Sequence, residues 1–376
     1  MRKLRETLRQ VGKPVRVLYW PDGTRVMLLP HGGRVLGVSA PGSEENFLWT
    51  NPAFDSPDSA RGFFRSDNWH NSGGDRTWIA PEMDLFFPKF PKLDTYFQQR
   101  SLDPGNYQLL EKQGDVRLMN RLAVRLSRSR ETLAARIAKS FGPAANPLRH
   151  ERDLKFKGLQ YAGYTQTTTF ELLGESRRPR SRVGLWQLTQ LPHGGELLIP
   201  TLSRASVRKI FSSKGSIPAR DIVITDHLVR YRMRQAGEHK ISLRAASLAN
   251  RMGYLRQTDN QWTLVIRNFF LNPSGEYVDA PWSEPDQLGF AVQACNVNSQ
   301  LGAFSEMEYH VPAIGHGTGR LTCSDESQVW CYRGSKSAIG AVARILLTPK
   351  PWSPEKRKTN TNPRKQVERG PEGMPV

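Results

Sequence analysis

Residues 14–40 read PVRVLYWPDGTRVMLLPHGGRVLGVSA and are the most informative segment about the fold. The segment contains three short runs, PVRVLYW, TRVMLLP and GRVLGVSA, whose β-branched, aromatic and alternating apolar residues are typical of strands with a buried face. Asp22-Gly23 separates the first two runs, and an Asp-Gly pair accepts the positive φ of a tight hairpin turn. The segment therefore predicts antiparallel strands joined by short turns.

Similar runs recur along most of the chain, punctuated by Gly, Pro and Asp. They are ENFLWT (45–50), GYTQTTTFELL (163–173), VGLWQLTQL (183–191), GELLIPT (195–201), DIVITD (221–226), NQWTLVIRNFFL (260–271) and SQVWCYR (327–333). Helical periodicity is rare: residues 127–141 fit an amphipathic helix or a continued strand meander, and residues 241–255 are a weaker helix candidate. We expect one all-β domain over residues 1–352. SPEKRKTNTNPRKQVERGPEGMPV has no apolar periodicity and predicts a disordered basic tail over residues 353–376.

The composition excludes some classes of protein. No apolar run approaches 18 residues, so we expect no membrane-spanning helix. The charged opening MRKLRETLRQ is not followed by the apolar region of a secretory signal. Three cysteines, an odd number in a long chain, fit reduced thiols better than a disulfide framework. These features predict a cytoplasmic protein.

The chain is strongly basic, with 54 Lys+Arg against 35 Asp+Glu and a formal charge of +19. The excess gathers in the tail, in RRPRSR (177–182) and in a set of arginines at positions 121, 125, 128, 130 and 136. No aromatic residue is interleaved with these clusters in the manner of a single-strand stacking platform. Nucleic acid is therefore not the favoured ligand, although the charge does not exclude it, and polyanion binding stays an alternative.

The most unusual local segment is SDNWHNSGGDRTWIAPE, residues 66–82. Two glycines let the backbone approach a ligand closely. Arg supplies planar donors, the carboxylates supply acceptors and Trp supplies a flat apolar face, a mixture that suits a pyranose. The alternative is a structural Asp–Arg pair with buried tryptophans. The candidate residues here are Asp75, Arg76, Trp78 and Glu82 as substrate-binding groups and His70 as a catalytic one.

A second candidate segment is FSEMEYHVPAIGHG, residues 304–317. In a strand, Glu306, Glu308 and His310 share one face because side chains alternate with a period of two. Crowded carboxylates raise one another's pKa, and two carboxylates with an imidazole suit acid–base chemistry. The alternatives are a polar edge face paired with arginines, or a carboxylate–histidine metal site.

Two further positions are candidates. His193 occupies a Pro-His-Gly-Gly turn between two expected strands, and Arg267 alternates with apolar neighbours in TLVIRNFF, where it would face a carboxylate or a ligand. The chain has no phosphate-loop motif and no Gly-x-Ser-x-Gly elbow, and its Cys and His spacing does not fit zinc. We therefore expect no cofactor and no metal.

Four of these features together resemble the galactose mutarotase-like superfamily: GGRVLGV in the strand-rich opening, ENFLWTNP, the SGGDRTW loop and the late strand FSEMEYHVPA. The resemblance covers roughly residues 10–350 and is greater to a bacterial branch that carries Gly-Gly-Asp-Arg/Lys followed by Trp and Ala-Pro. It implies a β-supersandwich of large antiparallel sheets that binds a sugar across the concave face of one sheet.

The resemblance also implies a chemistry. In mutarotases a glutamate on a late strand deprotonates the C1 hydroxyl and a histidine protonates the ring oxygen. Carried over, Glu306 or Glu308 would be the base, and His310, His193 or His70 the acid. Arg76 and Arg267 would hold hydroxyls or an anionic group, with Trp78 as the stacking platform. The chain departs from the family in lacking His-Leu-His-Gly-Gly and His-x-Tyr-Phe-Asn.

The sequence thus favours a carbohydrate-binding protein, with an aldose 1-epimerase-like isomerase acting on an acidic or phosphorylated sugar as the catalytic form of that hypothesis. A non-catalytic carbohydrate-binding or sensing module is the main alternative. A polysaccharide lyase is a further one, and its base would be Tyr309 or Tyr161.

Overall fold

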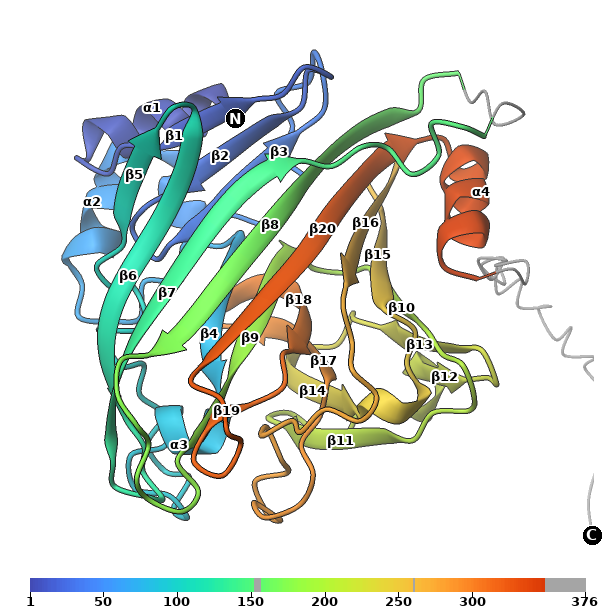
Figure 1. Ribbon diagram of the computed structural model, residues 1–376. Coiled ribbons are helices and arrows are strands. Elements are labelled where there is room, and N and C mark those ends of the chain that lie inside the picture. The colour runs from blue at the N-terminus through green and yellow to red at the C-terminus, as the bar shows by residue number, and fades with distance from the viewer. Residues whose placement is uncertain (152–156, 260, 349–376) are drawn as a thin grey trace, which may run out of the picture.

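Two large antiparallel sheets face each other in the computed structural model, which describes residues 1–151, 157–259 and 261–348 (Figure 1). The predicted tail, residues 353–376, lies outside the described residues. In the first sheet, hydrogen-bonded neighbours follow in the order β1 (Arg16–Tyr19), β2 (Arg25–Leu29), β3 (Arg34–Ser39), β4 (Asp75–Ala80), β9 (Arg182–Pro192), β18 (Gly302–His310), β17 (Val292–Ser299), β14 (Gly237–Leu243) and β11 (Val207–Ser212), with β19 (Ile314–Gly315) paired to β9.

The second sheet packs against the first. Its order is β12 (Ile222–Ile224), β13 (Leu228–Arg232), β10 (Glu196–Pro200), β15 (Arg251–Gln257), β16 (Trp262–Phe269), β20 (Thr322–Gly334), β8 (Gln160–Leu172), β7 (Thr132–Pro143), β6 (Asp115–Arg125) and β5 (Gln108–Lys112). The predicted all-β fold of large antiparallel sheets is confirmed.

Local sequence patterns explain where the strands form and how they are joined. Gly23 has φ +83°, and Thr24 N–H donates to Asp22 Oδ1 over 2.9 Å, so the predicted hairpin turn joins β1 to β2. In β6, buried and exposed residues alternate along the strand, as expected where one face packs on the core and the other faces solvent. Almost every position of β9 is buried, because both of its faces are covered.

Neither helix candidate forms a helix for most of its length, and for residues 127–141 the alternative of a continued strand meander is confirmed. Within residues 127–141, the chain forms β7, whose Leu133, Ala135 and Ile137 enter the core with a period of two. Residues 241–255 contain the end of β14, a short 3-10 helix at Ala245–Ser247 and the start of β15. Here the alternation and the pairing with neighbouring strands outweigh helix propensity.

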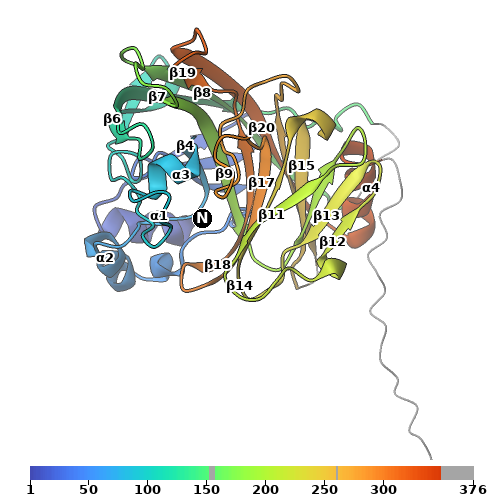
Figure 2. The ribbon, with the colours of Figure 1, turned by 90° about the horizontal axis from the view of Figure 1, so that it is seen from below.

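Helices lie at the periphery. Figure 2 shows α1 (Arg2–Gln10), α2 (Pro57–Arg65) and α3 (Glu82–Phe86) on one side of the molecule and α4 (Lys336–Leu346) on the opposite side. Two more 3-10 helices span Pro52–Asp55 and Ala219–Asp221. None of the helices in the described ranges is long and apolar enough to cross a membrane.

Candidate functional site

A cavity of about 1140 Å³ lies on the face of the first sheet that is turned away from the second sheet. Six adjacent strands of that sheet supply its floor, from β4 at one end to β11 at the other. The cross-strand register defines two rows of residues on this face. One row is Gln190, Glu306, Cys295, Lys240 and Phe211, and the other is Arg76, Leu188, Glu308, Gln293 and Ser242.

The glycine pair before β4 directs Arg76 into the cavity. Gly73 and Gly74 have φ of +94° and +75°, and a Cβ atom on either would lie 2.3 or 2.2 Å from a backbone oxygen of a neighbouring segment. Only glycine fits such a close approach in this conformation. The strand that follows then places Asp75 between the sheets and Arg76 on the cavity face.

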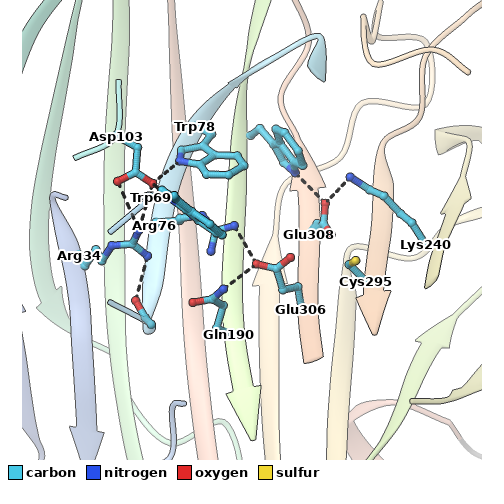
Figure 3. Close-up of polar contacts among 12 residues, drawn as sticks. Arg34, Trp69, Arg76, Trp78, Asp103, Gln190, Lys240, Cys295, Glu306 and Glu308 are labelled. Carbon is cyan, nitrogen blue, oxygen red and sulfur yellow. Dashed lines mark hydrogen bonds and ion pairs between the residues drawn. The ribbon is translucent and has the colours of Figure 1, made fainter. Parts of the chain in front are cut away.

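Arg76 is held by an ion pair and by aromatic rings. Its Nη2 lies 2.8 Å from Glu306 Oε1, and its guanidinium lies 4.2 Å from the ring centre of Trp78 and 5.2 Å from that of Trp69 (Figure 3). Among the described residues, Arg76 Nε and Nη1 have no hydrogen-bond partner although they are buried. These two donors are the unpartnered polar atoms of Arg76.

Asp103 organises this end of the cavity. Its carboxylate accepts hydrogen bonds of 2.9 Å from the indole N–H groups of both Trp69 and Trp78, and it pairs with Arg34 over 3.0 Å (Figure 3). Sequence reasoning missed Asp103 and Arg34, because nothing near either residue marks it as a partner of the other.

Two glutamates of β18 face the cavity together, as the strand period predicts. Glu306 accepts from Gln190 Nε2 over 3.0 Å, and Glu308 accepts from Trp186 Nε1 over 3.0 Å (Figure 3). Lys240 Nζ lies 3.2 Å from Glu308 and 3.1 Å from Glu82, so it bridges two carboxylates. Lys240 was also missed, since it stands in β14, far from the other site residues in sequence.

Burial sets the protonation of this cluster. Burial raises the pKa of Glu308; Lys240 opposes this rise, and the nearby Glu306 and Glu82 add to it. Burial likewise raises the pKa of Glu82. The pKa of Lys240 is raised, since the attraction of its carboxylates outweighs the cost of burying its charge. The cluster therefore contains a fixed cation and carboxyl groups that hold a proton more tightly than a free glutamate does.

The three candidate histidines do not line the cavity. His310 stacks on Trp186 at 5.3 Å, forms a hydrogen bond of 3.0 Å with Gln293, and has its pKa lowered to about 4 by burial. His193 contacts Asn296 over 3.0 Å at its turn. His70 contacts His31 over 3.1 Å and packs beside Phe63 and Phe64.

Three predicted substrate-binding residues are also placed differently. Asp75 and Arg267 form an ion pair with each other between the sheets, with Tyr164 donating to Asp75, and so they stabilise the interior. Trp78 lines the cavity but is only 3% exposed, because Arg76 covers one face and Phe86 packs against the ring. The ring is therefore not available as a stacking platform.

The tyrosines proposed as lyase bases lie elsewhere. Tyr309 donates to Asp325 over 2.6 Å between the sheets, and Tyr161 donates to the Ala144 carbonyl over 2.8 Å. Neither lines the cavity.

The possible metal ligands in the described chain that come together are Cys295, Glu306 and Glu308, whose ligand atoms lie within 4.8 Å of one another. His310 is not among them. Burial raises the pKa of Cys295, which favours the thiol over the metal-binding thiolate. Lys240 and Arg76 already supply positive charge to the two carboxylates. The arrangement suits hydrogen bonding better than metal binding.

The two basic clusters within the described ranges, residues 177–182 and the arginines between 121 and 136, lie outside the cavity and are partly neutralised. Arg128 and Arg180 both pair with Asp286, and Arg182 pairs with Glu276. The cavity itself is lined, within the described ranges, by two cations, Arg76 and Lys240, against four carboxylates, Glu82, Glu238, Glu306 and Glu308. The cavity therefore lacks the excess of basic residues that marks the whole chain.

The chain belongs to a family of unknown function (DUF6786), whose pattern matches residues 5–349. No curated protein matches it. Among solved structures, it is similar to a galactose mutarotase related enzyme from Lactobacillus acidophilus, with 10% identity, a TM-score of 0.42 and coverage of 85% of this chain and 97% of the other.

Two further structures have similar values. A galactose 1-epimerase from Lactobacillus acidophilus is 9% identical with a TM-score of 0.39, covering 85% of this chain and 93% of that one. A candidate aldose 1-epimerase from Klebsiella pneumoniae is 9% identical with a TM-score of 0.42, covering 91% and 85%. All three structures carry names from the group of proteins that the sequence features resemble.

Proposed function

We propose that the cavity binds a neutral carbohydrate and that its carboxyl groups give it aldose 1-epimerase-like activity. The observation that carries the proposal is the combination of paired carboxylates, two cations and unpartnered polar atoms on the floor of an aromatic cavity. Sugar hydroxyls both donate and accept, so they match such a mixed set, whereas an anionic ligand would meet an excess of carboxylates. This favours a neutral sugar over the acidic one expected from the overall charge.

Two groups are suited to move protons. Glu308 Oε1 is buried and has no partner among the described residues, which leaves it able to accept the proton of the C1 hydroxyl. The deprotonated hydroxyl oxygen then forms a carbonyl with C1. The bond from C1 to the ring oxygen breaks, and the ring oxygen takes a proton. Glu82, with its raised pKa, is the acid that we assign to this second step in place of a histidine. Rotation and the reverse steps give the other anomer.

Arg76 and Lys240 hold and polarise the sugar in this scheme. The free Nε and Nη1 of Arg76 donate to a sugar oxygen, and Lys240 keeps Glu82 and Glu308 close together. Such fixed donors stabilise charge that develops during ring opening.

The test is a binding screen of neutral reducing sugars by calorimetry, followed by NMR exchange spectroscopy of the two anomers. We expect Glu308→Gln to bind sugar within a few-fold of the wild type but to lose anomer exchange by about 100-fold or more. Glu326→Gln, on the exposed face of β20, is the matched control and should leave both unchanged. If no neutral sugar binds, the proposal is wrong.

The second candidate is a non-catalytic binding module, favoured by the absence of a histidine from the cavity lining in the described ranges. In that case sugar binds, yet wild type and Glu308→Gln exchange the anomers no faster than buffer does.

A further inference from the structure

The acid–base cluster occupies only one part of the cavity. The row that contains Glu306 continues through Cys295 and Lys240 to Phe211 on β11. Neighbouring strands are about 4.8 Å apart, so Phe211 stands roughly 14 Å from the Glu306 strand. A single pyranose in contact with Glu308 is too short to reach it. The volume of about 1140 Å³ also exceeds the roughly 300–1,000 Å³ of pockets for drug-sized ligands.

A β-bulge turns Phe211 toward the cavity. Lys209 pairs with Ile241, whose side chain enters the core, and by the period of two Phe211 would share that face. The register shifts between Lys209 and Phe211, so that Phe211 stands opposite Lys240 instead. Bulges commonly re-aim a side chain in this way. The result is an aromatic ring on the cavity face at the edge of the sheet.

This far end also offers the apolar surface that the floor lacks. Trp186 is only 1% exposed, with Lys240 over its ring and His310 stacked on it, and Trp78 is covered by Arg76 and Phe86. In contrast, Phe211 and Trp282 are half-buried and stack on each other at 5.4 Å and 15°. Phe87 supports Trp282 at 4.8 Å.

The cavity also has polar lining groups outside the acid–base cluster. Glu238, Ser299 and Gln300 line the same cavity. An apolar ring face bordered by hydrogen-bonding groups matches a sugar, which has C–H faces and hydroxyl edges.

We propose that the cavity takes a neutral oligosaccharide of at least two units, with the reducing unit at Glu306 and Glu308 and the next unit on Phe211 and Trp282. The inference rests on the proposed function and adds the substrate class to it. It assigns Phe211 and Trp282 as specificity-determining residues that contact the second unit only.

The experiment compares binding of matched neutral mono-, di- and trisaccharides of glucose, galactose and mannose with the full chain by calorimetry. The best disaccharide should bind about tenfold more tightly than its monosaccharide. Trp282→Ala and Phe211→Ala should each remove most of this gain and leave monosaccharide affinity unchanged. Trp282→Phe should restore much of it. Phe270→Ala, a matched truncation of a ring that is 71% exposed outside the cavity, should change neither.

The outcomes separate the two proposals. Equal affinity for monosaccharide and disaccharide, or a gain that survives both alanine variants, overturns the oligosaccharide inference and leaves the proposed sugar site in place. Absence of binding by every sugar in the set overturns both.

Discussion

The surroundings of Glu308 shift its pKa, and this shift predicts how anomer exchange should depend on pH. Burial raises its pKa, Lys240 opposes the rise, and Glu306 and Glu82 add to it. A base acts only when ionised and an acid only when protonated, so kcat/KM for anomer exchange should rise with pH as Glu308 ionises, with a midpoint well above the ordinary glutamate value of about 4.3, and fall again where Glu82 loses its proton. Rates measured by NMR between about pH 4 and 9 would locate this midpoint.

Two substitutions of Lys240 provide the control for that prediction. Because its charge favours the ionised form of Glu308, Lys240→Met should move the midpoint to higher pH, whereas Lys240→Arg should leave it near the wild-type value. A midpoint near that of a free glutamate, or one that Lys240→Met does not move, would contradict the assignment of Glu308 as base.

Single residues also show which parts of the site the sequence predicts and which it does not. The face shared by Glu306 and Glu308 follows from the strand period alone, and the structure has both on the cavity floor. Lys240, Gln190 and Trp186 reach the same carboxylates from other strands. Their positions depend on cross-strand register, which no local pattern in the chain encodes.

At the scale of elements, Asp103 connects parts of the chain that are far apart in sequence. It joins β3 through Arg34, β4 through Trp78, and the segment before β4 through Trp69. Asp103→Asn removes the charge that balances the fully buried Arg34 guanidinium. Breaking a buried pair by removing one partner typically costs about 3–5 kcal/mol, so we expect a loss of that size in the free energy of unfolding in urea.

Asp94→Asn is a suitable control for this loss, because Asp94 is exposed and its replacement should be nearly neutral. A cost for Asp103→Asn no larger than that of Asp94→Asn would show that the buried Arg34 guanidinium does not need the charge of Asp103.

The strands also show which local sequence patterns are sufficient to predict secondary structure. Asp22-Gly23 predicted its hairpin because the turn is local. Residues 127–141 were ambiguous, since Ala, Leu, Arg and Lys favour helix while the alternation of buried residues favours strand. The pairing of β7 with β6 and β8 resolved the ambiguity, and that pairing is a property of the sheet.

For the whole molecule, the sequence predicts large antiparallel sheets but not the order of the strands within them. β4 pairs with β9, and β9 with β18, across more than a hundred residues each time. These distant pairings bring the Gly-Gly segment and the late glutamate strand together, and they place Asp75 and Arg267 in the interior as a pair. The two candidate segments were recognised as polar and unusual, yet only the sheet order decides which of their side chains share a cavity.

The distribution of charge over the whole molecule also bears on whether the ligand is a neutral or an acidic sugar. The chain carries +19, but exposed arginines such as Arg121 and Arg125 lie on β6 of the second sheet, whereas the cavity lies on the first and has more carboxylates than cations. Charges beyond about 8 Å are largely screened at physiological ionic strength. A uronate should therefore bind about tenfold more weakly than the matched neutral sugar. Calorimetry at low and moderate salt tests this: tighter uronate binding that fades with salt would mean that the basic surface governs recognition.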